Sequence, residues 1–208
     1  MKKAIIFDYD GVIVDSFPSV YQVYKKTCER FGVAYPETLE KFRRTYGYNY
    51  SECLTNLGIK KEDFAEASKI YKTEIVKIKH EIFPGIKDVI IKLSQKYKLY
   101  LVTASHIAEV LPKIKDFGLD GFFVNVYCGD GNSGRKAEMF LDLFQAEGYQ
   151  PSEVTSIGDR AVDYDVAKKV GLADEDIILV TYGWGLDRSR IGRANIADHP
   201  EEILNFIN

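Results

Sequence analysis

Near its start the chain reads Ala4-Ile5-Ile6-Phe7-Asp8-Tyr9-Asp10-Gly11-Val12, four apolar residues followed by two closely spaced carboxylates. The apolar run predicts a short buried strand, and the turn after it carries Asp8 and Asp10. Alternate side chains of an extended chain point the same way, so both carboxylates can reach one pocket while Tyr9 points away. Two adjacent negative charges need a cation or a proton between them. We therefore expect the chemistry of the protein here, although Asp-x-Asp is also typical of solvated surface turns.

Short apolar runs alternate with helical patterns along most of the chain. Strands are predicted at residues 3–7, 99–103, 122–128, 154–158 and 177–181. Strands this apolar, separated by helices, are typical of a parallel sheet that is covered by helices on both faces. In such α/β folds the ligand lies at the carboxyl ends of the strands, where Asp8, Asp10, Thr103 and Asp159 fall.

One stretch interrupts this alternation. Between Pro18 and His80 no strand is predicted, and two apolar stripes at helical spacing run through the segment. We expect residues 17–81 to form a helical cap. The cap would be inserted into a core that is made from residues 1–16 and 82–208.

Four segments along the chain carry motifs in a fixed order. They are residues 7–16 (FDYDGVIVDS), 101–103 (LVT), 134–138 (GRKAE) and 156–163 (SIGDRAVD). Together they resemble the four signatures of the haloacid dehalogenase superfamily, in the branch of phosphoglycolate-phosphatase-like hydrolases with a helical cap. The resemblance implies an α/β fold, with a Rossmann-like parallel sheet between two layers of helices and a small all-helical cap inserted after the first strand.

The resemblance also implies an activity, a Mg²⁺-dependent phosphatase that acts on a small phosphorylated metabolite. Asp8 would be the nucleophile and form an aspartyl-phosphate. Asp10 would protonate the leaving alcohol and then deprotonate the attacking water. In this superfamily, members that handle phosphate carry Asp at the place of Asp10, whereas true dehalogenases do not. Thr103 and Lys136 would hold the phosphoryl group with a hydroxyl and a positive charge.

Lys136 is chosen over its neighbour Arg135. Many relatives show Lys-Pro-x-Pro before the following helix, and that pattern is missing here. The spacing to Phe140 and the apolar face of the next helix favours Lys136, while a solvated charge at the helix start is the alternative.

The implied metal site consists of carboxylates and one carbonyl. Mg²⁺ prefers oxygen ligands and keeps several waters, so few protein ligands are needed. The resemblance assigns Asp8, the backbone carbonyl of Asp10, and Asp159. Asp163 would bind through water or anchor the site from behind, and capping of the following helix is its equally plausible alternative role.

Substrate choice is expected to come from the cap, because the four signatures touch only what all phosphate esters share. Cap closure would present polar and aromatic residues to the leaving group. The candidates are Arg43, Arg44, Tyr46, Tyr48, Asn49 and Tyr50, with Arg43 and Tyr46 as the named choices. Simple packing is the alternative for the aromatic residues. Backbone amides at Gly11, Ala104 and Ser105 could add donors to the phosphate.

Composition narrows the class of protein. The net charge of −3 over 208 residues carries no basic block, so no nucleic-acid partner is expected. Cys28, Cys53 and Cys128 are too few for a disulfide framework or a zinc cluster, and His80 and His199 lack the spacing of a metal site. No apolar run reaches the length of a signal peptide or a membrane span. We expect a cytoplasmic monomer or homodimer without membrane contact.

Three alternatives to the phosphatase remain open. A sugar phosphomutase of the same superfamily would use the same aspartates but must preserve its phosphoenzyme between transfers. A receiver domain also combines Mg²⁺ with a phosphorylated Asp, but it has no helical insert and carries that Asp after a later strand. A non-catalytic phosphate binder is disfavoured because every charged position of the four signatures is present.

Overall fold

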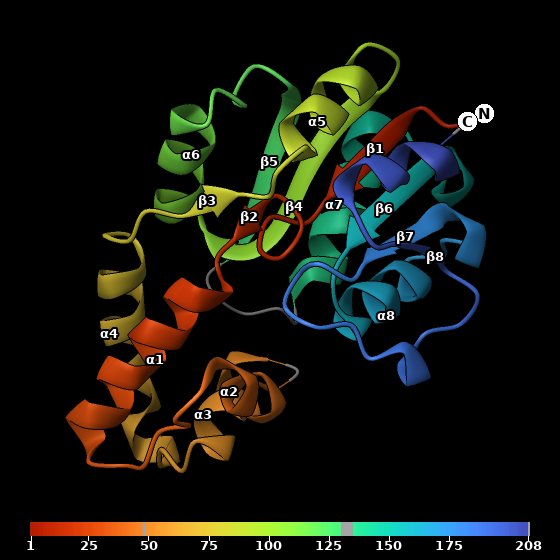
Figure 1. Ribbon diagram of the computed structural model, residues 1–208. Coiled ribbons are helices and arrows are strands. Elements are labelled where there is room, and N and C mark those ends of the chain that lie inside the picture. Colours follow the sequence, from red (N-terminus) through yellow and green to blue (C-terminus); the bar gives the residue numbers. More distant parts are fainter. Residues whose placement is uncertain (48, 130–134, 208) are drawn as a thin grey trace.

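A six-stranded parallel sheet forms the centre of the core (Figure 1). The computed structural model describes residues 1–47, 49–129 and 135–207. The strands are β1 (Ala4–Phe7), β4 (Lys98–His106), β5 (Phe123–Gly129), β6 (Val154–Gly158), β7 (Ile177–Val180) and β8 (Asn195–Ala197). They follow the order β5-β4-β1-β6-β7-β8, and every neighbouring pair is parallel. The loops after β4, β1 and β6 therefore meet at one edge, where ligands of such sheets bind.

Helices cover both faces of the sheet. One face carries α5 (Ile86–Ser94), α6 (Ile107–Asp116) and η6 (Pro200–Phe206), and the other carries α7 (Lys136–Glu147) and α8 (Ala161–Lys169). β1 shows why both layers are needed, because Ile5 and Phe7 pack into the first apolar cluster while Ala4 and Ile6 pack into the second. A strand that is buried on both faces has no polar side, which explains its unbroken apolar sequence. The predicted α/β fold with helices on both faces is confirmed.

Four helices lie outside this sandwich and form a separate lobe, at the lower left of Figure 1. They are α1 (Phe17–Phe31), α2 (Leu39–Thr45), α3 (Tyr50–Asn56) and α4 (Phe64–Ile75), with the short η1 (Lys61–Asp63) before α4. We call this lobe the cap. The chain enters and leaves it through β2 (Val14–Asp15) and β3 (Glu81–Ile82), which pair antiparallel. The cap has an apolar cluster of its own, and Trp184 from the core is part of that cluster.

The remaining elements are short, and the sequence patterns did not reveal several of them. The other 3-10 turns are η3 (Pro151–Glu153), η4 (Asp174–Asp176) and η5 (Arg188–Arg190). The patterns missed β2, β3 and β8, because two or three residues are too few for a period of two to be recognised. They also missed α6. The five predicted strands are present, with ends that differ by up to three residues.

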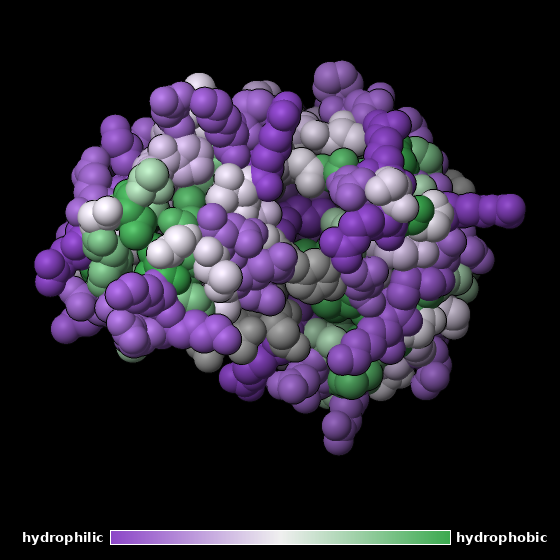
Figure 2. Space-filling model, turned by 90° about the horizontal axis from the view of Figure 1, so that it is seen from below, coloured by the Kyte–Doolittle hydropathy of each residue, from purple (hydrophilic) through white to green (hydrophobic). Residues whose placement is uncertain are grey.

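The surface is mainly hydrophilic on the face that Figure 2 shows from below, and hydrophobic side chains gather chiefly on its left, the side of the cap. Among residues 1–47, 49–129 and 135–207, no helix is both long and apolar enough to span a bilayer. The thiols of Cys28, Cys53 and Cys128 are free, and the first two are buried.

Candidate active site

The turn after β1 holds Asp10 in one orientation. Ser16 Oγ donates a hydrogen bond to Asp10 Oδ1 and Ser105 Oγ donates one to Asp10 Oδ2, each at 2.5 Å. Tyr9, between the two aspartates, is fully buried in the core, as the alternation of side chains predicts. Asp8 and Asp10 both line one cavity between the core and the cap. The Asp10 carboxyl is thus fixed at the wall of this cavity by two hydroxyl donors.

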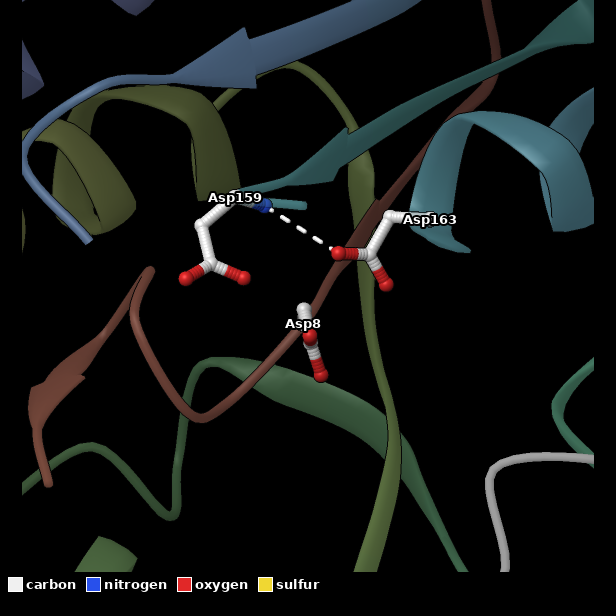
Figure 3. Close-up of side chains that lie close together, drawn as sticks. All are labelled: Asp8, Asp159 and Asp163. Atoms are coloured by element: carbon white, nitrogen blue, oxygen red, sulfur yellow. Dashed lines mark hydrogen bonds between the residues drawn. The ribbon is translucent and has the colours of Figure 1, made fainter. Parts of the chain in front are cut away.

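Three carboxylates from separate parts of the chain meet beside Asp10. Asp8 follows β1, Asp159 follows β6, and Asp163 lies in the first turn of α8. One oxygen atom from each lies within 4.8 Å of the others, and Figure 3 shows the three groups around a common space. The side chain of Asp10 does not belong to this cluster. The predicted contact of Asp10 with the metal would therefore be made by its backbone carbonyl.

The electrostatics of the cluster call for a cation. Burial raises the pKa of Asp8 to about 7, and the charge of Asp163 adds to this shift. Burial, together with the charges of Asp163 and Asp8, raises the pKa of Asp159 well above its ordinary value. Asp159 Oδ2 accepts a hydrogen bond from the backbone N–H of Trp184 at 2.6 Å, but the buried Oδ1 has no hydrogen-bond partner among the described residues. An orphaned carboxylate oxygen beside two further carboxylates fits a hard divalent cation such as Mg²⁺.

We expect Mg²⁺ to raise the melting temperature of the protein more at about pH 7.5 than at about pH 5. The pKa of Asp8 is about 7 in the fold, above its ordinary value of 3.8. As pH rises, the unfolded chain therefore ionises first, and this group destabilises the metal-free fold increasingly from about pH 4 and fully above about pH 7. A bound cation offsets that charge. Thermal melts at both pH values, with KCl of matched ionic strength as control, test this, and equal shifts would contradict it.

Lys136 supplies a fixed positive charge to the cluster. Its Nζ lies 2.9 Å from Asp8 Oδ2 and 2.6 Å from Asp163 Oδ1, and the residue is only 5% exposed. Although burial alone would lower it, the pKa of Lys136 is raised because the two carboxylates favour the charged form. The neighbouring Arg135 is exposed and pairs with Glu138 at 3.3 Å. The geometry therefore agrees with the choice of Lys136 over Arg135.

Asp163 combines the two roles that the sequence left open. Its Oδ2 accepts hydrogen bonds from the backbone N–H groups of Asp159 and Arg160, at 3.2 and 3.0 Å, at the start of α8. Its Oδ1 faces Lys136. Burial alone would raise the pKa of Asp163, but the pKa is lowered because the positive charges of Lys136 and Arg160 and the hydrogen bonds from both residues together outweigh burial. The side chain thus caps the helix and belongs to the carboxylate cluster at the same time.

The cavity has a volume of about 390 Å³ and is lined by both the core and the cap. From the core, Thr103, Ala104 and Ser105 line it at the end of β4, beside the carboxylates. From the cap, the lining includes Tyr46, Asn49, Tyr50, Tyr71 and Lys72. Tyr48, one of the cap candidates, and Gly134, the first residue of the third motif, lie outside the described residues. Most predicted phosphate contacts and three of the six cap candidates therefore border the same space.

Arg43, a predicted substrate-binding residue of the cap, contacts the core in the structure. Its Nη1 donates to the carbonyl of Gly183 in the core at 3.0 Å, and its guanidinium lies 4.6 Å from the centre of the Phe17 ring. Arg43 and Arg44 line a neighbouring pocket rather than the cavity with the carboxylates. Arg43 thus joins the cap to the core, and from the core Arg160 Nη2 donates in return to the carbonyl of Gly47 at 2.6 Å.

Gly11 was named because its amide could add a donor to the phosphate, and in the structure this amide lies within the turn after β1. The Gly11 N–H donates to the carbonyl of Val14 at 3.0 Å, so this turn already uses it. Glycine is required here for two other reasons. Its φ of 77° lies in the left-handed region, and an added Cβ would stand 1.9 Å from Asp159 Oδ2. Gly11 therefore makes room for the carboxylate.

A buried polar cluster beside the cavity was missed. Glu109 and Lys113 lie on α6, and Lys113 Nζ is 3.3 Å from Glu109 Oε1 and 3.3 Å from His80 Nε2. It also donates to the carbonyl of Ile75, the last residue of α4, at 3.2 Å. Burial, reinforced by Asp10, raises the pKa of Glu109 to about 7, while burial and Lys113 lower that of His80 to about 4. His80 has partners after all, but they are about 30 residues away in sequence.

Comparisons with known proteins agree with this site. The profile of the haloacid dehalogenase-like hydrolase family matches residues 5–173, so the chain belongs to this family. The chain is similar to a phosphorylated carbohydrates phosphatase of Thermotoga maritima, with 26% identity over 99% of this chain and 98% of that protein. A phosphoglycolate phosphatase of Chromobacterium violaceum is 29% identical over 91% of this chain and 89% of its own length.

A solved structure of the same family has a similar fold. A haloacid dehalogenase-like family hydrolase from Streptococcus pneumoniae superposes with a TM-score of 0.86 at 25% identity, covering 100% of this chain and 99% of that one. The predicted family, with its phosphoglycolate-phosphatase-like branch, and the predicted enzyme class, a phosphoric monoester hydrolase, are thereby confirmed.

Proposed function

We propose that this chain hydrolyses a small phosphate monoester through a phosphorylated Asp8, with Mg²⁺ as cofactor. The observation that carries the proposal is the common cavity of Asp8 and Asp10, with Lys136 2.9 Å from the Asp8 carboxylate and the Asp8, Asp159 and Asp163 cluster beside it. A nucleophile, a proton donor and positive charge are what phosphoryl transfer requires.

In the first step a carboxylate oxygen of Asp8 attacks phosphorus, and the ester bond from phosphorus to the leaving oxygen breaks. Asp10 gives its proton to that oxygen, so the product leaves as an alcohol rather than an alkoxide. The Lys136 ammonium and the Thr103 hydroxyl hold the phosphoryl oxygens. Mg²⁺ held by Asp8, Asp159 and the Asp10 carbonyl would supply further positive charge for the phosphate.

In the second step Asp10, now a carboxylate, takes a proton from water while the water oxygen attacks phosphorus. The bond between phosphorus and the Asp8 oxygen breaks, which returns Asp8 as a carboxylate and releases inorganic phosphate. The same Asp10 side chain therefore acts first as an acid and then as a base. Its two hydroxyl partners, Ser16 and Ser105, support this assignment because they keep the carboxyl in place through both steps.

We further propose that residues 17–81 act as the cap that selects the leaving group. Tyr46, Asn49 and Tyr50 border the same cavity as the carboxylates. Relatives that act on phosphoglycolate and on phosphorylated carbohydrates are both similar to this chain, so both classes of ester belong in any test.

The proposal is tested by phosphate release from phosphoglycolate, sugar phosphates and nucleoside monophosphates, with Mg²⁺ and with excess chelator. We expect turnover that is lost with chelator and restored by Mg²⁺, because the carboxylate cluster needs a cation. Folded protein without turnover on any ester would contradict the proposal. Turnover that appears only with a sugar bisphosphate activator would indicate the phosphomutase alternative.

A further inference from the structure

We infer that Trp184 is a positioning residue, which orients Asp10 through the hydroxyl of Ser16 and ties that orientation to the position of the cap. The inference rests on the proposed roles of Asp8 and Asp10. Trp184 follows β7 in the core, yet its ring belongs to the apolar cluster of the cap.

A directed chain of hydrogen bonds runs from the indole to the acid. Trp184 Nε1 donates to Ser16 Oγ at 3.2 Å, and Ser16 Oγ donates to Asp10 Oδ1 at 2.5 Å. Ser16 is fully buried and Trp184 is 8% exposed, so water does not compete freely for these groups. An indole N–H can only donate, and a hydroxyl has a single proton. The indole therefore obliges Ser16 to turn its proton toward Asp10.

This orientation matters because Asp10 has to meet two different atoms. It delivers a proton to the leaving oxygen and later removes one from water, and small displacements of a reacting group are costly. Ser105 holds Asp10 Oδ2 from the side of the β4 loop, while Ser16 holds Oδ1 from the side of α1. With both hydroxyls in place the carboxyl cannot rotate without losing a hydrogen bond.

The indole ring also packs against the cap. Its ring centre lies 5.2 Å from that of Phe17, the first residue of α1, and 5.1 Å from that of Tyr46, which meets it nearly at a right angle. The backbone N–H of the same residue donates to Asp159 Oδ2 in the carboxylate cluster at 2.6 Å. One residue thus contacts the cap, the carboxylate cluster and, through Ser16, the acid. Movement of the cap away from the ring would loosen the orientation of Asp10.

The test compares Trp184→Phe, Ser16→Ala and the double variant. Phenylalanine retains a ring against Phe17 and Tyr46 and the backbone contact to Asp159, but it removes the Nε1 donor. We expect each single variant to lower kcat for an alkyl phosphate about 10-fold with little change in KM. Because both variants break one chain, the double variant should be no slower than the slower single variant.

An aryl phosphate separates positioning of the acid from general damage to the site. A phenol with a low pKa leaves without a proton from Asp10, so the burst of phenol release that accompanies phosphorylation of Asp8 should stay close to the wild-type rate in both variants. Equal losses for alkyl and aryl esters would overturn the inference, and so would losses that multiply in the double variant.

Tyr182→Phe is the matched control, because it removes a hydrogen bond from the same segment, between its hydroxyl and the carbonyl of Val12 at 3.2 Å, without touching Asp10. It should behave like the wild type, and an equal loss there would overturn the inference. Trp184 is the only tryptophan of the chain and keeps its hydrogen bond to Ser16 in Tyr182→Phe, so unchanged indole emission in this variant would show that the control leaves the cap packing intact. A wild type without turnover would defeat the proposed function itself, whereas an active wild type with unaffected variants would defeat only this inference.

Discussion

Replacement of Asp8 by Asn should abolish turnover, with a loss on the order of 10⁴-fold or more in kcat, because no other side chain can replace the nucleophile. Asp8 lines the cavity, 2.9 Å from the ammonium of Lys136. Asparagine has nearly the same shape, so the packing of the cavity should be preserved. Phosphate release under saturating Mg²⁺ measures the loss, and trapping of the acid-stable phosphoprotein by mass spectrometry locates the modified residue.

Asp10→Asn is the informative companion to this variant. The nucleophile Asp8 is unchanged, and the amide oxygen and nitrogen of the new side chain can still contact the hydroxyls of Ser16 and Ser105. An amide can neither donate nor accept the transferred proton. With an activated aryl ester as substrate, we expect the phosphoenzyme to accumulate in Asp10→Asn. In Asp8→Asn we expect no phosphoenzyme. Labelling of Asp8→Asn to the wild-type extent would refute the assignment of the nucleophile.

Lys136→Ala should cost far more than Arg135→Ala. The ammonium of Lys136 is buried between Asp8 and Asp163, and removal of one partner from a buried ion pair costs about 3 to 5 kcal/mol. Loss of its charge from the phosphoryl oxygens should lower kcat by about 100-fold or more. Urea unfolding followed by circular dichroism and phosphate release measure the two effects. Part of the lost stability should return with Mg²⁺, since a cation offsets the same carboxylates.

Arg135→Ala serves as the matched control for the neighbouring position. Arg135 is exposed and pairs across one helical turn with Glu138, and such surface pairs contribute between zero and about 1 kcal/mol. Its stability and turnover should stay close to those of the wild type. Equal losses in the two alanine variants would contradict the choice of Lys136.

The core of the fold could be predicted because the sequence pattern of each strand lies within the strand itself. Each strand of the buried sheet carries its own apolar run, and both neighbours of β1 contain residues of a recognisable motif. The same holds for Asp8, Asp159 and Asp163, which the order of strands in a parallel sheet brings to one edge. Lys136 could also be chosen from its spacing on the helix that follows.

Contacts between distant segments that the strand order does not bring together could not be predicted. Nothing near Arg43 in sequence reveals that the carbonyl of Gly183 lies within its reach, so a cation in the cap was read as a substrate ligand. The hydrogen bond from Trp184 to Ser16 joins residues 168 positions apart. Gly11 was assigned to the phosphate, although its backbone angle and the nearness of Asp159 explain the glycine. Such contacts depend on how two segments pack, which no periodicity records.

The two-residue strands β2 and β3 have a mechanical consequence. Both covalent connections of the cap pass through this single antiparallel ribbon, an arrangement that would let the cap turn about one axis (Figure 1). At the end of the cap near α2, only non-covalent contacts, such as those of Arg43 and Arg160 with backbone carbonyls, join it to the core. Hydrogen bonds to charged groups contribute about 1.5 to 3 kcal/mol each, so a few of them can part and re-form within every catalytic cycle. Entry of the substrate and exit of the alcohol would then take place on the α2 side, away from the ribbon.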